Sequence, residues 1–315
     1  MAHILDELKA KIQGKNIRIV FPEGNDPRII EAVNRLAEEA LIQPIVVGPV
    51  SATLHADVTV LDPADYAEKD AMYDAFMERR PGKHTKEDAQ ALLAEETYFG
   101  TMLVYQGKAD GLVSGAAHST GDTVRPALQI IKTKPGIKRA FGYFLMLRGD
   151  EKYLMADCAI NPNPSAEELA QFAVESGKIA PLFNINPKIG LLSFSTNGSG
   201  VTEESLKVKK ATHIAQADQP DMAIDGELQF DAAFVPSVAQ KKYPDSRVAG
   251  QVNVFVFPTL DAGNIGYKIA QRLGQFEAIG PILAGLNQPV NDLSRGCDAD
   301  DAYHLAIITA AQTIK

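Results

Sequence analysis

The 315-residue chain carries 31 basic and 40 acidic side chains, and the net charge of −9 argues against a nucleic-acid-binding surface as its main purpose. With 45% hydrophobic and 23% charged residues, its composition is that of an ordinary globular protein and excludes disordered, collagenous and coiled-coil chains. No apolar run approaches the roughly 18 residues of a transmembrane helix, so we expect no nucleic-acid partner and no membrane.

The N-terminal segment 1–15 mixes acidic and basic residues with leucine and isoleucine, which predicts an amphipathic helix rather than a signal peptide. We therefore expect a cytoplasmic protein. The two cysteines, Cys158 and Cys297, lie far apart in no CxxC arrangement, which favours packed thiols over a disulfide or a zinc site.

Short β-branched runs alternate with segments of helical period along the chain. In the first half we predict strands at 16–21, 44–48, 56–61 and 110–114, and helices at 27–40, 66–79 and 123–132. In the second half we predict strands at 140–147, 153–157, 188–194, 252–257 and 279–283, with helices after most of them. Capping patterns predict helix starts at Thr85, Ser165 and Thr202. This alternation predicts mostly parallel sheets covered by helices.

Several standard sites are absent from the sequence. No Gly-Lys pair continues as a P-loop, no GxGxxG follows a strand, and neither GxSxG nor HExxH occurs. The six histidines lack ligand spacing, so metal catalysis has little support.

Two hydroxyl-rich and glycine-rich loops follow predicted strands. In Ser114–Pro126 we expect free backbone N–H groups at a helix start, with Arg125 nearby, to suit a phosphoryl group; a tight turn capped by Ser119 or Thr120 is the alternative. The loop Ser193–Thr202 has the same character, and there a purely conformational role is at least as well supported.

Two acidic segments complete the set of candidates. Asp225–Asp231 is more simply explained as a solvated acidic turn with a helix cap than as acid–base machinery. In 291–301, aspartates suit a first helical turn, but the preceding Ser-Arg-Gly brings a hydroxyl and a fixed cation to the same helix start. Such a set can orient a phosphorylated electrophile, stabilise negative charge and remove a proton.

In this order, and together with 22–28, these segments resemble the phosphate acetyltransferases, or phosphotransacetylases, over nearly the whole chain. The most specific stretches are 252–258, 263–272 and 289–297. The resemblance implies reversible transfer of the acetyl group between acetyl phosphate and coenzyme A. It implies an α/β fold of two three-layer α/β/α domains with a cleft between them, similar to isocitrate and isopropylmalate dehydrogenases, and a homodimer. We expect one domain of residues 1–137 plus 289–315 and an inserted domain of residues 138–288.

By position, the resemblance assigns proton abstraction to Asp301, and charge stabilisation and substrate orientation to Arg295 and Ser294. Arginines that bind phosphoryl or CoA groups fall on Arg125, Arg272 and Arg79, with Arg80 adjacent to the last. The remaining substrate-binding candidates are Ser114, Ser119, Thr120, Ser199, Asn264, Tyr267 and Lys268. No metal and no other cofactor is expected, since CoA is a substrate; stimulation by a monovalent cation stays open.

These residue types fit the reaction. A thiol with a pKa near 8.5 is mostly protonated at neutral pH, so a carboxylate that accepts its proton raises the reactive fraction. We therefore expect direct transfer in a ternary complex. The competing covalent route would use Cys297 or Cys158, but no histidine lies beside either in sequence.

The chain departs from the family pattern at Asn197, where lysine is usual, and at Ala284, where glutamine is usual. Both changes concern how CoA or phosphate is held. Three other functions are alternatives: a phosphate butyryltransferase-like enzyme, a dehydrogenase using the acidic cluster at 225–231 for a metal, and a non-catalytic acyl-CoA-sensing module. The presence of Ser294, Arg295 and Asp301 favours an enzyme.

Overall fold

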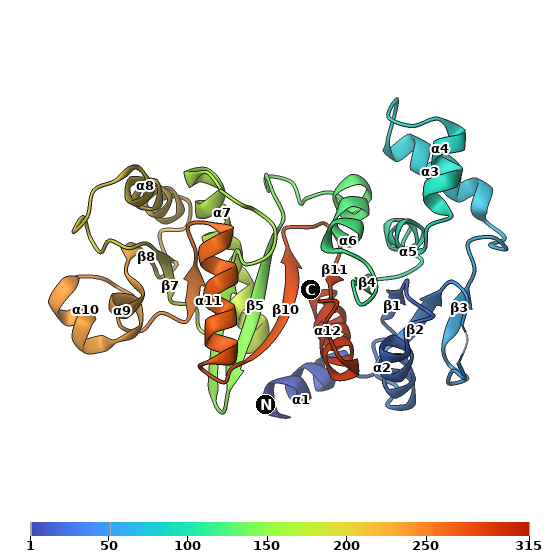
Figure 1. Cartoon of the computed structure of the whole chain (residues 1–315), viewed down its shortest axis with the longest axis horizontal. Helices are drawn as coiled ribbons and strands as arrows, with labels where there is room; N and C mark the ends of the chain where they lie inside the picture. The colour runs from blue at the N-terminus through green and yellow to red at the C-terminus, as the bar shows by residue number, and fades with distance from the viewer. Residues whose placement is uncertain (1, 51, 315) are drawn as a thin grey trace. The chain divides into compact units, whose positions relative to one another are not determined.

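The structure, a computed structural model, describes residues 2–50 and 52–314. The chain divides into two compact units. The inserted unit consists of Gly136–Gly285, and the first unit consists of Ala2–Pro135 together with Leu286–Lys315. The chain therefore enters the inserted unit at 135/136 and leaves it at 285/286, where the sequence had suggested 137/138 and 288/289. Each unit has its own sheet (Figure 1).

The sheet of the first unit has five strands in the order β11-β4-β1-β2-β3, and all neighbouring pairs are parallel. The strands are β1 (Arg18–Phe21), β2 (Gln43–Val47), β3 (Thr59–Leu61), β4 (Gly111–Ser114) and β11 (Val290–Asp292). Because every strand runs the same way, all carboxyl ends meet at one edge, where sheets of this kind place their ligands.

Two pairs of helices pack against this sheet. Helices α2 (Pro27–Glu38) and α12 (Ala299–Gln312) contact each other and the strands, and α5 (Glu96–Tyr105) and α6 (Thr120–Pro126) form the second pair. The remaining elements are α1 (Ala2–Ile12), α3 (Lys69–Arg79), α4 (Lys86–Leu93) and the π-helical turn η1 (Ala127–Ile131). The apolar face of α1 is buried at Ile4, Leu8 and Ile12, as its amphipathic pattern predicts.

The sheet of the inserted unit has six strands in the order β10-β5-β6-β9-β7-β8. They are β5 (Phe141–Arg148), β6 (Glu151–Ala156), β7 (Ile189–Leu192), β8 (Ile224–Leu228), β9 (Val254–Val256) and β10 (Glu277–Ala284). The pairs β10-β5 and β5-β6 are antiparallel, and the other three are parallel. The tight turn at Gly149, whose φ is +58°, returns the chain directly from β5 to β6, so this sheet is more mixed than the sequence suggested.

Helices of the inserted unit are α7 (Ala166–Ile179), the 3₁₀ turn η2 (Ala180–Phe183), α8 (Glu203–Asp218), α9 (Phe230–Phe234), α10 (Pro236–Lys242) and α11 (Leu260–Arg272). Helices α7 and α8 pack together over the parallel strands, and α11 contacts β10, β5 and β6. The predicted starts at Ser165 and Thr202, and that at Thr85 in the first unit, are confirmed by reciprocal capping boxes. No helix within the described residues is long and apolar enough to cross a membrane.

One predicted turn is wrong. The acidic segment at 225–231 is not solvated, because most of it is the edge strand β8, in which Asp225 and Glu227 are buried at 6% and 1% exposure. Of the three carboxylates, Asp231 lies on the surface, where it pairs with Lys242. Charged residues in a strand are tolerated here because loop donors satisfy part of their hydrogen-bonding capacity.

Candidate active site

Three loops lie side by side at the carboxyl edge of the first unit's sheet, because they follow the neighbouring strands β1, β4 and β11. The second and third are in direct contact: the N–H of Leu293 donates to the carbonyl of Ser114 at 2.6 Å. Gly115, with φ of +112°, sits so close that an added Cβ would lie 2.5 Å from the Leu293 carbonyl. Only glycine fits at this approach, which brings the two loops together.

The carboxylate of Glu23, in the loop after β1, fills the glycine-rich loop after β4. Its Oε1 accepts hydrogen bonds from the N–H groups of Gly115, Ala117 and His118 at 2.8–3.1 Å, and its Oε2 accepts one from Ala116 at 3.0 Å. The expectation that these N–H groups are free for a phosphoryl oxygen is therefore wrong, since a carboxylate of the protein itself occupies them.

Glu23 also holds the ring of His118, whose Nδ1 lies 2.8 Å from its Oε1. Burial of Glu23 would raise the pKa of its carboxyl, but hydrogen bonds from His118 and the backbone outweigh burial and hold the pKa below its usual value. The same bond raises the pKa of His118. Since Glu23 is ionised, Nδ1 is the donor, and Nε2 is left for other contacts.

Arg28, at the second position of α2, ties all three loops together. Its Nη2 donates to the Ala116 carbonyl at 2.7 Å, and its Nη1 donates to the carbonyls of Arg295 and Cys297 at 2.8 and 3.0 Å. Asp26, the N-cap of α2, pairs with the same guanidinium at 2.6 Å. The sequence contributed the 22–28 stretch only as part of the family resemblance, because a role for Glu23 and Arg28 depends on loops 90 to 270 residues away.

Asp292, the last residue of β11, is fully buried, and neither of its carboxylate oxygens has a hydrogen-bond partner within the described residues. Burial raises the pKa of its carboxyl to about 6, with a contribution from Glu23, and the nearby hydroxyls of Thr120 and Thr123 offset only part of the rise. Ser114, which pairs with Asp292 across the sheet, is buried as well. A direct substrate contact by the Ser114 hydroxyl is therefore not supported.

The three predicted catalytic residues lie on the loop after β11 and the first turn of α12. Ser294 and Arg295 are exposed, and Asp301 is half-buried. Asp298 caps α12 by accepting from the Asp301 N–H at 2.9 Å, and Asp301 Oδ2 accepts from the Asp298 N–H at 3.1 Å. The capping box fixes the Asp301 carboxylate in the first turn of α12, a position that favours acidic residues.

The predicted arginines of the first unit differ in their surroundings. Arg125 is exposed on α6, and its Nη1 lies 3.9 Å from an Asp122 oxygen. Arg79 donates to the carbonyls of Ile130 and Ile131 at 2.6 and 3.1 Å, which ties α3 to η1.

The neighbouring Arg80 lies on the Arg125 side of the unit. Burial raises the pKa of Tyr98, and the charges of Arg125 and Arg80 oppose this rise, so both guanidinium groups lie near the Tyr98 hydroxyl. The Nε of Arg80 is buried without a hydrogen-bond partner within the described residues.

Ser119 and Thr120 begin α6 next to this loop. Ser119 is the N-cap, and its Oγ lies 2.6 Å from an Asp122 oxygen, so the capping alternative is confirmed for Ser119. Thr120 is exposed, and its hydroxyl lies near Asp292.

In the inserted unit, the loop Ser193–Thr202 is also closed by a buried glutamate. Glu227 Oε1 accepts from the Gly198 N–H at 2.7 Å and from Ser195 Oγ at 2.9 Å. Ser199 is exposed, and its hydroxyl accepts from the Thr196 N–H at 3.0 Å. The anion at this turn is thus the protein's own carboxylate.

Helix α11 carries the other predicted binding residues of the inserted unit. Asn264, Tyr267 and Lys268 share one face because they are spaced three and four residues apart. Asn264 donates to the Cys158 carbonyl and accepts from Lys268, while Tyr267 stacks on Phe144 with ring centroids 3.9 Å apart. Arg272, the last residue of the helix, is exposed.

Both thiols are poor nucleophiles in this structure. Cys158 is fully buried, and burial raises its pKa well above that of a free thiol. Cys297 is 6% exposed, and burial raises its pKa to about 11 although Arg28 pulls it down. Thiolate is the reactive form, so neither cysteine is activated.

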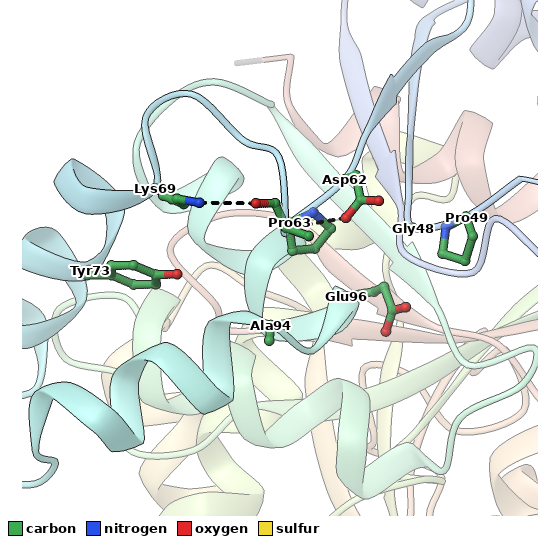
Figure 2. A pocket seen from close by; sticks show the side chains of 9 residues that line it. Gly48, Pro49, Asp62, Pro63, Lys69, Tyr73, Ala94 and Glu96 are labelled. Atoms are coloured by element: carbon green, nitrogen blue, oxygen red, sulfur yellow. Dashed lines mark hydrogen bonds between the residues drawn. The ribbon is translucent and has the colours of Figure 1, made fainter.

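A pocket of about 180 Å³ lies at the same sheet edge, beyond the carboxyl ends of β2 and β3. Figure 2 shows Asp62, Lys69, Tyr73 and Glu96 around it, with Lys69 bonded to the backbone of Ala64. A wider hollow of about 530 Å³ lies near Arg18 and Asp110, at the amino-terminal end of β1. Within the described residues no group of three or more His, Cys, Asp or Glu side chains is placed to hold a metal ion.

The fold and these loops define an α/β protein whose candidate site lies at the carboxyl edge of a parallel sheet, and the chain belongs to the family described as "Phosphate acetyl/butaryl transferase", matched over residues 3–310. It is 56% identical to the phosphate acetyltransferase of Bacillus subtilis (strain 168), with all of both chains covered. The crystal structure of a phosphotransacetylase from Streptococcus pyogenes matches with a TM-score of 0.97 and 58% identity, over 100% of this chain and 99% of that one.

A 4-hydroxythreonine-4-phosphate dehydrogenase from Klebsiella pneumoniae shares the fold alone, with a TM-score of 0.55 and 17% identity over 95% of this chain and 100% of that one. The expected dehydrogenase-like α/β fold is thereby confirmed. The predicted reaction is confirmed as well: the chain is an acyltransferase that interconverts acetyl-CoA and phosphate with acetyl phosphate and CoA.

Proposed function

We propose that the chemistry takes place at the carboxyl edge of the first unit's sheet, where Asp301, Arg295 and Ser294 act on acetyl phosphate and CoA. The observation that carries this proposal is the tie between loops: Arg28 and the Leu293 N–H join the loop bearing the Ser-Arg pair to the loop after β4. Fixed loops hold reacting groups in one geometry, which is where much of the catalytic advantage of an enzyme arises.

In the proposed reaction, Asp301 accepts the proton of the CoA thiol. The thiolate then attacks the acyl carbon, and negative charge develops on the carbonyl oxygen. Arg295 and Ser294, which are exposed on the loop before α12, stabilise that charge, an effect worth about 3 kcal/mol for one well-placed donor. Transfer is direct, and the high pKa of about 11 at Cys297 supports this over a covalent route.

Phosphoryl and CoA groups are bound, we propose, by exposed polar residues of each unit. In the first unit Arg125 serves this role with Arg80 rather than Arg79, because Arg79 already donates to two carbonyls. Ser119 and Thr120 line the start of α6. In the inserted unit the proposed contacts are Ser199, Asn264, Tyr267, Lys268 and Arg272. The departures at Asn197 and Ala284 concern this binding and leave the reaction type unchanged.

The direct test is acetyl-CoA formation from acetyl phosphate and CoA, without added divalent metal or nucleotide, in parallel with butyryl phosphate. We expect rapid transfer with preference for the acetyl group. A butyryl preference would keep the mechanism and change the substrate. No transfer from either acyl phosphate would contradict the proposal and favour an acyl-CoA-sensing module.

We further propose that the enzyme is a cytoplasmic homodimer with no cofactor, with monovalent-cation stimulation to be measured in the same assay. Free thiols at both cysteines suit a reducing compartment.

Helix α11 exposes Ile265, Ile269 and Leu273 at four-residue spacing, with Leu273 82% exposed, which supports an apolar contact with a second copy. Light scattering after size exclusion should give the mass of two chains, and Leu273→Asp should lower it; a monomeric wild type would contradict the dimer.

A further inference from the structure

The leaving group sets a requirement that the residues above do not meet. When a thiolate displaces phosphate from the dianion of acetyl phosphate, the departing group is the phosphate trianion unless it gains a proton as it leaves. The trianion is far more basic than a phosphate monoester dianion, whose protonated form has a pKa of about 6. A proton donor at the bridging oxygen therefore lowers the barrier, as general acids do for poor leaving groups.

His118 has the geometry of a held proton donor. Nδ1 of its ring lies 2.8 Å from Glu23 Oε1, and Glu23 is itself fixed by four backbone N–H groups. The Glu23 side chain is 1% exposed, whereas the His118 side chain is 34% exposed. The ring is thus anchored on its buried side, and Nε2 has no hydrogen-bond partner within residues 2–50 and 52–314. A carboxylate that orients an imidazole in this way is the arrangement of acid–base histidines.

The loop that carries His118 is joined to the loop that carries the Ser-Arg pair. Arg28 donates to Ala116, two residues before His118, and to the carbonyls of Arg295 and Cys297. The backbone bond from Leu293 to Ser114 closes the same junction. The anchored imidazole and the proposed base Asp301 thus belong to one sheet edge of one unit.

We propose that His118, oriented by Glu23, is the general acid that protonates the departing phosphate. This inference rests on the proposed function. In the step, the thiolate sulfur forms a bond to the acyl carbon, and the bond from that carbon to the bridging oxygen breaks. The bridging oxygen takes the electron pair and the Nε2 proton, which gives hydrogen phosphate.

The protons balance over a turnover. Asp301 has gained the thiol proton and His118 has lost one, and exchange with solvent restores both groups. In the reverse direction, neutral His118 accepts the proton from hydrogen phosphate as the phosphate oxygen attacks the thioester. The same group therefore serves as acid in one direction and base in the other.

The charges around His118 favour a ring that keeps its proton near neutral pH. Glu23 contacts it directly, and Glu96 at the start of α5 and Asp122 on α6 add negative charge. On the other side, Arg28 holds the same loop, and burial disfavours the charged ring. The three carboxylates prevail, and the pKa of His118 lies above its usual value.

The test compares wild type, His118→Asn and His55→Asn in acetyl-CoA formation. Asparagine places a donor where Nδ1 was, so the bond to Glu23 is kept and Nε2 is lost. His55 is a surface histidine beside Asp57 and serves as the matched control. Turnover is measured against pH with acetyl phosphate, and again with acetyl methyl phosphate, whose leaving group is a monoester that departs without a proton.

With acetyl phosphate we expect kcat of His118→Asn to fall about 10²-fold or more, with CoA binding unchanged. Wild-type kcat should fall as pH rises through the pKa of His118, and the variant should lack this alkaline limb. With acetyl methyl phosphate, the decrease in kcat caused by His118→Asn should be much smaller. As a second variant, Glu23→Gln removes the charge that raises the pKa of His118, and should move the alkaline limb to lower pH.

Two results would overturn the inference: turnover of His118→Asn equal to wild type, or an equal loss at every pH with the alkaline limb retained. Both results differ from failure of the proposed function. If the proposed function were wrong, the wild type itself would transfer no acetyl group from acetyl phosphate.

Discussion

Glu23 and Asp292 are two buried carboxyl groups at one edge of one sheet, and their surroundings differ completely. Glu23 follows β1 and receives five hydrogen bonds, four from the backbone and one from His118. Asp292 ends β11, is equally buried, and receives none within the part of the chain that the structure describes. The pKa of Glu23 is lowered, and that of Asp292 is raised to about 6.

Hydrogen-bond donors, rather than burial, decide the charge of a carboxyl group at this edge. Glu23 is a structural anion that organises the glycine-rich loop and orients His118. Asp292, directly before Leu293 and Ser294, has a buried carboxyl group without a hydrogen-bond donor within the described residues. Unsatisfied buried groups of this kind concentrate at functional sites, where stability is lost to the demands of the reaction.

The largest effect should come from removing the satisfied carboxylate. Glu23→Ala leaves four loop N–H groups and the His118 ring without their acceptor, and should lower the free energy of unfolding by about 3–5 kcal/mol at pH 7.5. The pKa of Glu23 is lower in the folded state than in the unfolded state. The difference in free energy of unfolding between wild type and variant is therefore greatest above the unfolded pKa near 4.5, and it shrinks as pH falls through the folded-state pKa. Urea unfolding at several pH values checks it. A loss of stability no larger than that from removing an exposed glutamate would show that Glu23 is not the acceptor that holds this loop.

The opposite sign is expected at Asp292. Its pKa is raised from 3.8 to about 6, so the folded state binds the proton more tightly, and wild-type stability falls as pH rises from about 4 to 6. Asp292→Asn removes that cost and should stabilise the fold by up to roughly 3 kcal/mol above pH 6.

The same unfolding measurement, repeated at pH 4, should show this gain vanish. Asp65→Asn, at an exposed position of the same unit, is the control and should change little at either pH. Destabilisation by Asp292→Asn at pH 7.5 would show that the Asp292 carboxylate has donors after all.

The smallest effect should come from Cys297, which lies behind the same loop but carries no charge. With its pKa raised to about 11, almost none of it is thiolate at pH 7.5. Cys297→Ala should retain turnover, with nothing approaching the roughly 10⁶-fold loss that follows removal of a covalent nucleophile. Steady-state kinetics checks this. A loss of that size would restore the covalent route and make this thiol the nucleophile.

The fold was largely predictable, because most of its helices and strands show a recognisable sequence pattern over many residues. The helices at α2, α7 and α8 have both an apolar period and a cap at Asp26, Ser165 or Thr202. The strand β11 has only three residues, and β8 carries two carboxylates, so neither shows the β-branched run that marks a strand. The sequence predicts β5 and β6 as two strands, but it does not predict that they pair antiparallel, because strand pairing depends on tertiary contacts.

The candidate site was predictable as a set of loops but not as a set of contacts. The family resemblance placed Ser294, Arg295 and Asp301 on one loop and helix start, and the glycine-rich loop on another. It did not reveal that the N–H groups of that loop bind Glu23, because the two segments are about 90 residues apart. The roles of His118 and Arg28 depend on the same contact between the loop after β1 and the glycine-rich loop. A local sequence pattern does not predict that contact.

The most direct test of Asp301 as the base is the turnover of Asp301→Asn beside Asp300→Asn. Asp300 is the neighbouring residue on the same helical turn, 68% exposed and paired with Arg35, so it controls for charge at the helix start. We predict that Asp301→Asn lowers kcat for acetyl-CoA formation by about 10²–10⁴-fold, with CoA still bound and partial recovery at high pH, where the thiol ionises unaided. Asp300→Asn should stay near wild type. Near-normal turnover of Asp301→Asn would show that Asp301 is not the group that takes the thiol proton.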